Sequence, residues 1–330
     1  MRLQGLLLLG LIGVGAALTG CKPSAGADGK TLIRFATDWR AEAEHGGFYE
    51  ALATGEYAKR GLDVHIVEGG PTVNVPELVA SGAVELGDGS NSFIVMNLAN
   101  AHAPVRAVAA FMQKDPQVLL AHPDAGINAI GDMKGHPILL SDASKTAFWP
   151  WMKQKYGFSD DQVRSYTFDN GPFILDHHVV QEGYLTSEPY TIEKAAKFTP
   201  KVFLLADQGY PSYAAMVLAA DTLIAKNPAA VRAFVEASAV GWKAYLHGDP
   251  KPADALILKD NPDMTEDVLA QAREKMRQYG LVDGGDAASL GLGAMTDAHW
   301  DAFFKIASPN GSQNARDAYS LQFLPNPPVK

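Results

Sequence analysis

The stretch "EHGGFYEALATGEYAKRGLDVHIVEGGP", residues 44–71, decides how the chain should fold. It predicts a helix over residues 46–61, since Gly61 suits a helix C-cap and apolar residues recur at near-helical spacing at Phe48, Leu52, Ala53 and Tyr57. The next stretch, 62–70, alternates like a strand and ends in two glycines. The His45-Gly46-Gly47 turn near the start of the quoted stretch also suits an oxyanion hole, a metal site or the rim of a binding cleft.

Strands and helices alternate on both sides of this stretch. Strands are expected at 32–39, 62–70, 83–90, 105–113 and 117–123, and helices at 46–61, 73–82 and 91–102. Alternation with short connections is typical of an α/β layered fold with a largely parallel sheet. From Asp221 onward the chain is mostly helical, and Asn227 and Pro228 provide a cap and a first turn for one of these helices.

The order of elements indicates two lobes. We expect residues 31–122 and 210–330 to form lobe 1 and residues 123–209 to form lobe 2. A chain that crosses from one lobe to the other and back makes a hinge with a cleft between them. In open α/β sheets, ligands bind at the carboxyl ends of the strands, so the loops there are the expected lining of the cleft.

The N-terminus predicts export. Residues 1–20 contain one arginine, an apolar run and then "LTG" before Cys21, which together are typical of a secretory signal peptide. "LTGC" resembles the bacterial lipobox, in which the cysteine is lipidated, and Cys21 is the single cysteine of the chain. Residues 21–30 are expected to form a flexible tether. The sequence therefore predicts a body anchored by lipid to a membrane, in the periplasm or at the cell surface.

Composition narrows the class of partner. The chain has 330 residues, 47% of them hydrophobic, and a net charge of -9. No stripe of lysine and arginine occurs, so nucleic acid is not an expected partner. We expect a monomer that binds a small molecule.

Several motifs resemble a known family. "DWRAEAEHGGFYEALATGEYAKRGLDVHIVEGGPTVNVPELVASGAVELGDGS", 38–90, and "GYLTSEPY", 183–190, resemble the solute-binding proteins of ABC importers for thiamine-pyrimidine precursors, riboflavin and sulfonates or taurine. The pattern is most similar to the branch shared with the fungal thiamine-pyrimidine synthase and covers roughly residues 32–245. The resemblance implies a type II periplasmic-binding fold with a hinged cleft, capture of a small solute and delivery to a membrane permease.

Candidate ligand contacts come from the loops at the strand ends. They are Trp39, Glu44, His45, Gly46, Tyr49, Asp88, Ser90, Asn91, Ser144, Asn170, Glu188, Tyr190 and Tyr210. Trp39 is interpreted as a stacking plate or a core aromatic, Ser90 as a ligand contact or a helix cap, and Tyr210 as a cleft wall or hinge packing. Gly46 and Gly47 are expected to expose backbone N–H groups to a ligand, with Phe48 in the core and Tyr49 in contact with the solute.

The sequence lacks the motifs that the alternative enzyme classes require. The sequence has no G-x-S-x-G, no H-E-x-x-H, no C-x-x-C and no P-loop, and the adjacent His177 and His178 would point to opposite faces of a strand. The pyrimidine synthase that the chain resembles carries a pyridoxal-bearing lysine and a cysteine-rich motif, whereas this chain has no cysteine after Cys21. We therefore expect no enzyme activity, no cofactor and no metal.

The mixture of side chains favours one kind of solute. The strand-end loops combine aromatic residues with acids, among them Asp38, Glu44, Asp88 and Glu188. Such a lining suits a neutral or cationic heterocycle better than an anion. A thiamine-pyrimidine precursor is the first hypothesis, and riboflavin, taurine, alkanesulfonate or nitrate binding and a solute-sensing lipoprotein are the alternatives.

Overall fold

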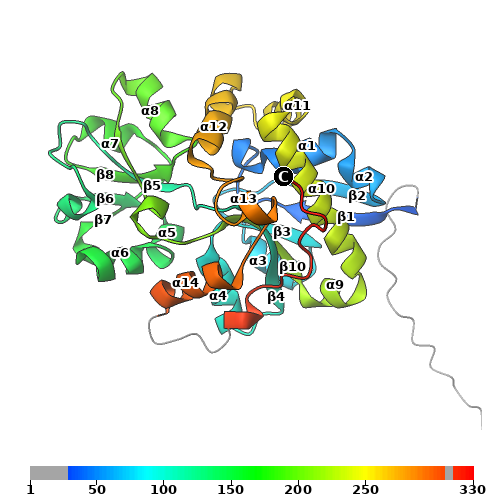
Figure 1. Ribbon diagram of the computed structural model, residues 1–330. Helices are drawn as coiled ribbons and strands as arrows, with labels where there is room; N and C mark the ends of the chain where they lie inside the picture. The colour runs from blue at the N-terminus through cyan, green and yellow to red at the C-terminus, as the bar shows by residue number, and fades with distance from the viewer. Residues whose placement is uncertain (1–28, 309–314) are drawn as a thin grey trace, which may run out of the picture.

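The structure, a computed structural model, describes residues 29–308 and 315–330 (Figure 1). The predicted signal peptide, residues 1–20, the lipidation site Cys21 and the predicted tether up to residue 28 lie outside the described residues. Among the described helices, none combines the length and the apolar character that a membrane crossing requires.

Two five-stranded sheets form the centres of two lobes (Figure 1). The first sheet contains, in spatial order, β2 (Leu62–Val67), β1 (Thr31–Ala36), β3 (Leu86–Gly89), β10 (Ala214–Ala220) and β4 (Val105–Met112). The second contains β7 (Val163–Ser165), β6 (Ile138–Leu140), β8 (Val180–Tyr184), β5 (Gln117–Ala121) and β9 (Lys201–Leu204). The predicted α/β class with two lobes is confirmed.

One strand in each sheet runs against the others. These strands are β10, antiparallel to β3 and β4, and β5, antiparallel to β8 and β9. Each is the strand that follows a crossing between the lobes, so it starts where its parallel neighbours end: Gln117 pairs with Tyr184, and Ala214 with Met112. The carboxyl ends of the parallel strands therefore face the junction between the lobes.

The strand at residues 117–121 lies in a different sheet from the one expected. The sequence placed it in lobe 1 with a boundary after residue 122, but β5 pairs with β8 and β9 in the second sheet. The first crossing is thus the short segment 113–116, and the chain returns between Leu204 and Ala214. All five residues of "QVLLA" are buried, so their pattern fits the middle of either sheet.

Helices cover both faces of the first sheet. Lobe 1 contains α1 (Gly46–Ala53), α2 (Glu56–Lys59), α3 (Val75–Ala80), α4 (Ser92–Asn100), α9 (Asp221–Lys226), α10 (Pro228–His247), α11 (Lys251–Asp260), α12 (Glu266–Tyr279), α13 (Ala287–Leu290), α14 (Asp297–Ala307) and the short 3₁₀ turns η2 (Ala43–His45) and η6 (Ala315–Asp317). Phe35 of β1 packs with Phe48 and Phe234 on one face, and Ala36 joins the core of the opposite face. Both faces of the sheet are therefore buried.

Lobe 2 has shorter helices. They are α5 (Asp142–Thr146), α6 (Trp149–Tyr156), α7 (Gly171–Leu175), α8 (Glu188–Ala196) and the 3₁₀ turns η3 (Ile130–Met133), η4 (Asp160–Gln162) and η5 (Ala206–Gln208). The segment 144–157 is divided between α5 and α6, with Pro150 in the first turn of the second. The expected helix over 46–61 is likewise divided, because Gly55 adopts a left-handed φ of 73° between α1 and α2.

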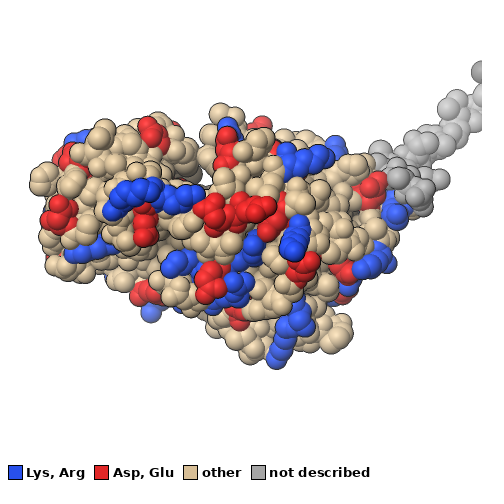
Figure 2. Space-filling view, turned by 90° about the horizontal axis from the view of Figure 1, so that it is seen from above, with Lys and Arg blue, Asp and Glu red and all other residues tan. Residues whose placement is uncertain are grey.

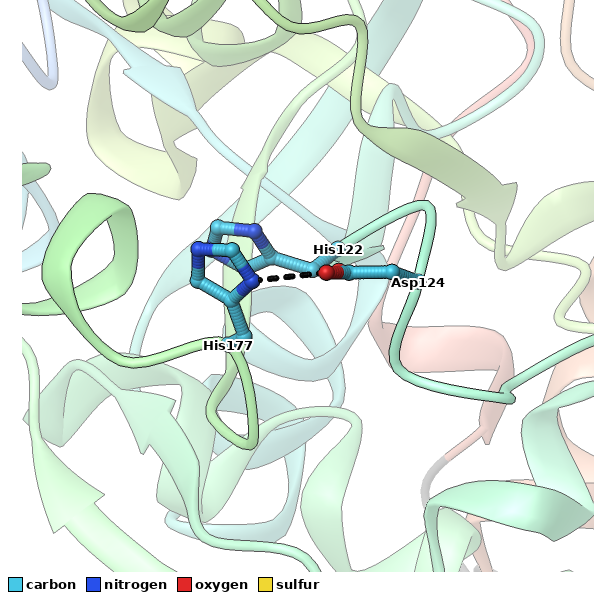
Figure 3. A group of neighbouring side chains, drawn as sticks. All are labelled: His122, Asp124 and His177. Carbon is cyan, nitrogen blue, oxygen red and sulfur yellow. Dashed lines mark hydrogen bonds and ion pairs between the residues drawn. The ribbon is translucent and has the colours of Figure 1, made fainter.

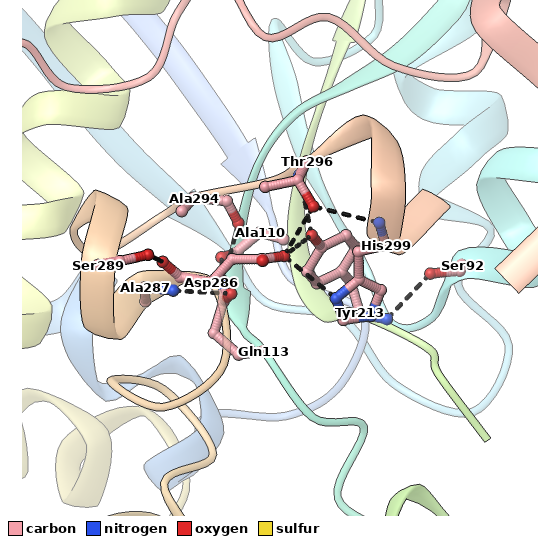
Figure 4. A network of polar contacts seen from close by, with 10 residues as sticks. All are labelled: Ser92, Ala110, Gln113, Tyr213, Asp286, Ala287, Ser289, Ala294, Thr296 and His299. Carbon is pink, nitrogen blue, oxygen red and sulfur yellow. Dashed lines mark hydrogen bonds and ion pairs between the residues drawn. The ribbon is translucent and has the colours of Figure 1, made fainter. Parts of the chain in front are cut away.

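A polar network anchors the two crossing segments to lobe 1 (Figure 4). The side-chain amide of Gln113 donates to the carbonyl oxygens of Ala110 at 2.8 Å and Ala294 at 2.9 Å. In the return segment, the Tyr213 hydroxyl donates to Asp286 at 2.5 Å, while the ring stacks on His299 with centroids 3.8 Å apart. The crossing segments are thus held by the buried side chains of Gln113 and Tyr213, whose polar groups pair with lobe 1.

Charged side chains are interspersed on the surface. Figure 2 shows lysine and arginine mixed with aspartate and glutamate over the face seen from above.

Candidate functional site

Acidic side chains from both lobes meet at the strand ends. Lobe 1 contributes Asp38, Glu42 and Glu44 from the segment after β1, and Asp88 from β3, while Glu188 begins α8 in lobe 2. We call these five residues the cleft carboxylates. Besides burial, the charges of Glu44, Asp38, Glu188 and Asp88 all raise the pKa of Glu42, so each of these four acids lies within electrostatic reach of Glu42.

Two direct contacts join the lobes at this site. The Thr186 hydroxyl of lobe 2 donates a hydrogen bond to Glu44 Oε1. Trp39 lies against Phe168 of lobe 2, with ring centroids 4.5 Å apart and planes tilted by 48°. Because Trp39 is half-buried and Phe168 is exposed, the pair forms the edge of the site rather than part of a lobe core.

His45 connects two of the carboxylates. It is only 1% exposed, and its Nε2 lies 2.9 Å from Asp38 Oδ1 and 3.6 Å from Asp88 Oδ2. Its Nδ1 and the Asp88 Oδ1 are buried without a hydrogen-bond partner in the described chain. Buried polar atoms in folded proteins are nearly always paired, so these two atoms mark a place where a ligand would complete the hydrogen bonding.

Burial controls the protonation of these acids. Desolvation, with the nearby Asp38 charge, raises the pKa of Asp88 well above its ordinary value, and desolvation also raises the pKa of Glu42 and Glu44. Desolvation, with the charges of Glu44 and Glu182, raises the pKa of Glu188 to about 7. Asp38 is the exception: burial opposes its ionisation, but the hydrogen bond and charge of His45 and a hydrogen bond from Ser90 outweigh it and lower its pKa.

The cleft carboxylates have little positive charge around them. Within residues 29–308 and 315–330, none of the five forms an ion pair with lysine or arginine, and His45 is the basic group that contacts them. Several negative charges in one buried site are costly unless they are protonated or neutralised by a partner. The arrangement can therefore accept N–H donors or a cation, whereas it offers an anion no positively charged partner apart from His45 among the described residues.

Predicted contacts in lobe 2 line the adjoining wall. Glu188 Oε2 accepts a hydrogen bond of 2.7 Å from the Tyr184 N–H. Asn170 Oδ1 accepts one of 2.7 Å from Gln181 and one of 3.2 Å from Tyr166. Ser144 is buried further along, where its hydroxyl lies 3.1 Å from the Ser141 hydroxyl. Of these three predicted residues, Glu188 is the one grouped with the acids of lobe 1.

Gly46 has a different role from the one expected. Its N–H was expected to face a ligand, but it donates to the Ala43 carbonyl. A Cβ at Gly46 would lie 2.1 Å from the Tyr245 ring, and one at Gly47 would lie 2.1 Å from the Trp242 ring. Both glycines are therefore required for the close packing of α1 on α10.

Three predicted tyrosines lie away from the carboxylates. Tyr49 is buried with its hydroxyl 3.2 Å from Asp260 of α11, so α1 turns it away from the cleft, while Phe48 lies in the core as expected. The Tyr190 hydroxyl donates to Asp267 of α12 at 2.7 Å, which makes it a contact between the lobes at the rim. Tyr210 is buried and packs against Trp151, with centroids 5.2 Å apart, so hinge packing describes it best.

In the loop after β3, one residue caps the next helix and another hydrogen-bonds to Asp38. Asn91, rather than Ser90, caps α4, since its Oδ1 accepts from the N–H groups of Phe93 at 3.1 Å and Ile94 at 3.3 Å. Ser90 is left to hydrogen-bond Asp38. The cap holds the loop so that Ser90 and Asp88 lie beside the segment after β1.

Sequence reasoning missed Glu42, Thr186 and Phe168. Glu42 and Glu44 alternate in "RAEAEH", and this repeat at a strand end was a signal that both acids approach the cleft. Thr186 lies inside the "GYLTSEPY" motif but was not singled out. Phe168 follows a short strand, and only the closure of the two lobes brings it to Trp39.

Two groups of side chains have the composition of a metal site. Asp38, His45 and Asp88 form one, and His122, Asp124 and His177 form the other, with candidate ligand atoms within 4.8 Å of one another in each group. The first group belongs to the cleft. The second lies elsewhere in lobe 2 and is considered below.

Two lobes with a hinge and a polar site between them define the architecture of a solute-binding protein. Residues 42–253 match the family described as NMT1/THI5 like, so the chain belongs to that family. This finding confirms the resemblance seen in the sequence.

Curated relatives extend over most of the chain. The formylaminopyrimidine-binding protein of Halalkalibacterium halodurans is 25% identical over 317 residues, which cover 92% of this chain and 87% of that protein. The riboflavin-binding protein RibY of Chloroflexus aurantiacus is 24% identical over 296 residues, covering 84% and 82%. Among solved structures, the periplasmic sulfonate-binding protein SsuA of Methylobacillus flagellatus matches with a TM-score of 0.61 at 14% identity, over 89% of this chain and 92% of that one, and shows the shared fold.

Proposed function

We propose that this protein is the extracytoplasmic solute-binding component of an ABC importer and that it captures a small heterocycle rich in N–H donors, such as a thiamine-pyrimidine precursor. The observation that carries the proposal is the group of five cleft carboxylates without a lysine or arginine partner in the described chain. A bound aminopyrimidine would supply the missing donors or positive charge. Hydrogen bonds to charged groups contribute roughly 1.5–3 kcal/mol each.

Aromatic side chains favour a planar solute. Trp39 and Phe168 belong to different lobes and meet at the edge of the site. A flat ring bound beside them gains stacking as the lobes close, and its edge then faces Asp38, Asp88 and Glu188. Capture would therefore couple closure of the hinge to recognition of both the faces and the edge of the ring.

Binding describes the site better than catalysis does. His45 and the acids offer proton donors and acceptors, but no serine or cysteine nucleophile is held by His45 among its contacts in the described chain. The names of the two curated relatives also refer to binding. The partners we propose are a small solute, a membrane permease and, through lipid on Cys21, a membrane on the non-cytoplasmic side.

Riboflavin is the second candidate, because one relative is named for it. Its isoalloxazine ring would stack as a pyrimidine ring does, but this ring system is larger than a pyrimidine and needs more room between the lobes. A sulfonate is disfavoured, since the cleft carboxylates would repel its negative charge.

Calorimetric titration of the full chain tests the proposal. The solutes are 4-amino-5-hydroxymethyl-2-methylpyrimidine, its formylamino relative, riboflavin and taurine. We expect heat and saturation with an aminopyrimidine, and a gain in unfolding free energy of about 2.7 kcal/mol at a hundredfold excess over Kd. Binding of taurine alone would contradict the proposed solute class, and binding of none of the four would contradict the whole proposal.

A further inference from the structure

A second polar cluster lies at the far end of β5 in lobe 2. His122 follows the last residue of this strand, whereas Gln117 at its start pairs with Tyr184 beside the cleft. Five residues of strand span roughly 17 Å, so the cluster is separated from the cleft carboxylates by about the length of β5. It is a different site from the one proposed for the solute.

His122 is held in a defined orientation. It is fully buried, and its ring packs against Phe173 and Phe198, with centroids 4.6 Å and 4.4 Å away. Its Nε2 lies 2.6 Å from the Phe173 carbonyl oxygen. Because a carbonyl oxygen only accepts hydrogen bonds, Nε2 carries the proton and Nδ1 keeps the lone pair.

The Nδ1 atom of His122 is buried and has no hydrogen-bond partner in the described chain. A metal-binding histidine typically donates its other ring N–H to a carbonyl or carboxylate, which fixes the tautomer. The Phe173 carbonyl provides this arrangement for His122. The unpaired lone pair is therefore of the kind that a metal ion uses.

Two further ligand groups lie beside it (Figure 3). Asp124 comes two residues after His122, and His177 lies in the turn between α7 and β8. His177 Nδ1 is 2.9 Å from Asp124 Oδ2, and the rings of His177 and His122 stack with centroids 4.1 Å apart. All three residues place a candidate ligand atom within 4.8 Å of the others.

One movement is needed for joint coordination. The two rings are stacked with centroids 4.1 Å apart and planes that differ by only 16°, so their lone pairs lie in separate, nearly parallel planes and do not converge on one ion. The His177 side chain is 56% exposed and can turn about its own bonds, whereas His122 is fixed. Joint coordination therefore requires His177 to rotate so that one of its ring nitrogens faces the same point as the Nδ1 of His122.

We propose that His122, Asp124 and His177 bind a Zn²⁺ ion. Two imidazoles and one carboxylate are a donor set that zinc accepts, and water can complete the tetrahedron because Asp124 and His177 are exposed to solvent. The ion would tie the end of β5 to the α7–β8 turn. His177 contacts His122 and Asp124, which lie more than 50 positions earlier in the chain, and not the adjacent His178.

The test uses the full-length chain, purified without a polyhistidine tag and titrated with zinc sulfate in competition with a chromogenic chelator. His177→Ala and Asp124→Asn alter exposed residues, so folding is checked by an unchanged unfolding midpoint without zinc. His178→Ala is the matched control, since this histidine is adjacent and exposed but is not part of the cluster. We expect each of the first two variants to weaken zinc binding at least tenfold and the control to change it less than twofold.

The cleft offers the competing location, since Asp38, His45 and Asp88 also form a candidate group. Asp88→Asn should leave zinc affinity unchanged if the ion binds at His122. Three results would each overturn the proposal. The unmodified chain could fail to bind zinc, His177→Ala and Asp124→Asn could bind zinc as tightly as the unmodified chain does, or only Asp88→Asn could lose affinity. None of these results bears on whether the cleft binds a pyrimidine.

Discussion

Two carboxylates near the junction of the lobes differ in how completely they are hydrogen-bonded. Asp286 Oδ2 accepts from the Tyr213 hydroxyl at 2.5 Å and from Thr296 at 3.1 Å, and it lies 3.2 Å from His299 Nδ1 (Figure 4). Asp88 is 2% exposed, yet its Oδ1 has no partner in the described chain and its Oδ2 is 3.6 Å from His45. The described chain supplies hydrogen-bond partners to Asp286, whereas under the proposed function the free oxygen of Asp88 is completed by the solute. Stability and ligand affinity should therefore respond separately to changes at these residues.

The largest effect is expected from Asp88→Asn. The substitution preserves shape but removes a carboxyl group that can ionise against a bound N–H donor or cation, which should weaken solute binding by about 2–3 kcal/mol, or roughly a hundredfold. Unfolding free energy at pH 7 should not fall, because asparagine resembles the neutral acid that burial favours by raising the pKa of Asp88. Calorimetric titration and urea unfolding measure the two quantities. A large loss of stability with unchanged affinity would reverse the roles assigned to the two carboxylates.

Asp286→Ala should produce the complementary result. Removing the carboxylate leaves the hydroxyls of Tyr213 and Thr296 without their acceptor, which should lower unfolding free energy by about 2 kcal/mol in a urea titration. Solute affinity should change less than twofold. Asp283→Ala is the control, because its ion pair with His247 is near the surface and should cost less than about 1 kcal/mol. Equal losses in the two variants would contradict the special role of Asp286.

The pH dependence of the ligand-free protein provides a smaller test. The pKa of Glu188 rises from an ordinary value of 4.5 to about 7 in the fold, so the folded state binds more protons than the unfolded state between these values. Unfolding free energy should therefore fall as pH rises from 5 to 7, by about 1 kcal/mol for this group after allowance for its partial exposure. Glu188→Gln should make the profile, measured by urea unfolding, correspondingly flatter. Identical slopes in both proteins would show that Glu188 is not the titrating group.

The smallest effect is expected at the rim. Tyr190 and Lys194 both contact Asp267 across the lobes, but these side chains are partly exposed. Tyr190→Phe removes one hydrogen bond in contact with water and should change solute affinity by about twofold or less, as measured by calorimetry. A loss of solute affinity as large as that expected for Asp88→Asn would indicate that Tyr190 contacts the solute.

Local signals in the sequence predicted most elements. The Asn227 side chain caps α10 and Pro228 occupies its first turn, as expected, because capping depends on neighbouring residues alone. The assignment of β5 to a sheet depends on partners far away, and an apolar strand carries no information about them. The same limit explains why the strand ends predicted that acids gather at the junction but did not reveal Thr186 or Phe168, which approach from the other lobe.

Individual roles were harder to predict than the group. Gly46 and Tyr49 are on a helix whose rotation is set by packing against α10 and α11, and a rotation of about half a turn would exchange cleft and core. The glycines of "HGGF" are explained by two aromatic rings about 200 positions later, Trp242 and Tyr245. The residues around the two glycines therefore give no information about the rings against which they pack.

The position of β10 has a consequence for the order of folding. Lobe 2 has a sheet made from one continuous segment, residues 117–204, whereas the first sheet is interrupted until β10 inserts between β3 and β4. The pairing of Val217 with Asp88 joins residues more than a hundred positions apart, and such distant contacts form late. As the chain emerges from its N-terminus, the second lobe can assemble before the first is complete. The solute site, which needs both, is therefore among the last features of the molecule to form.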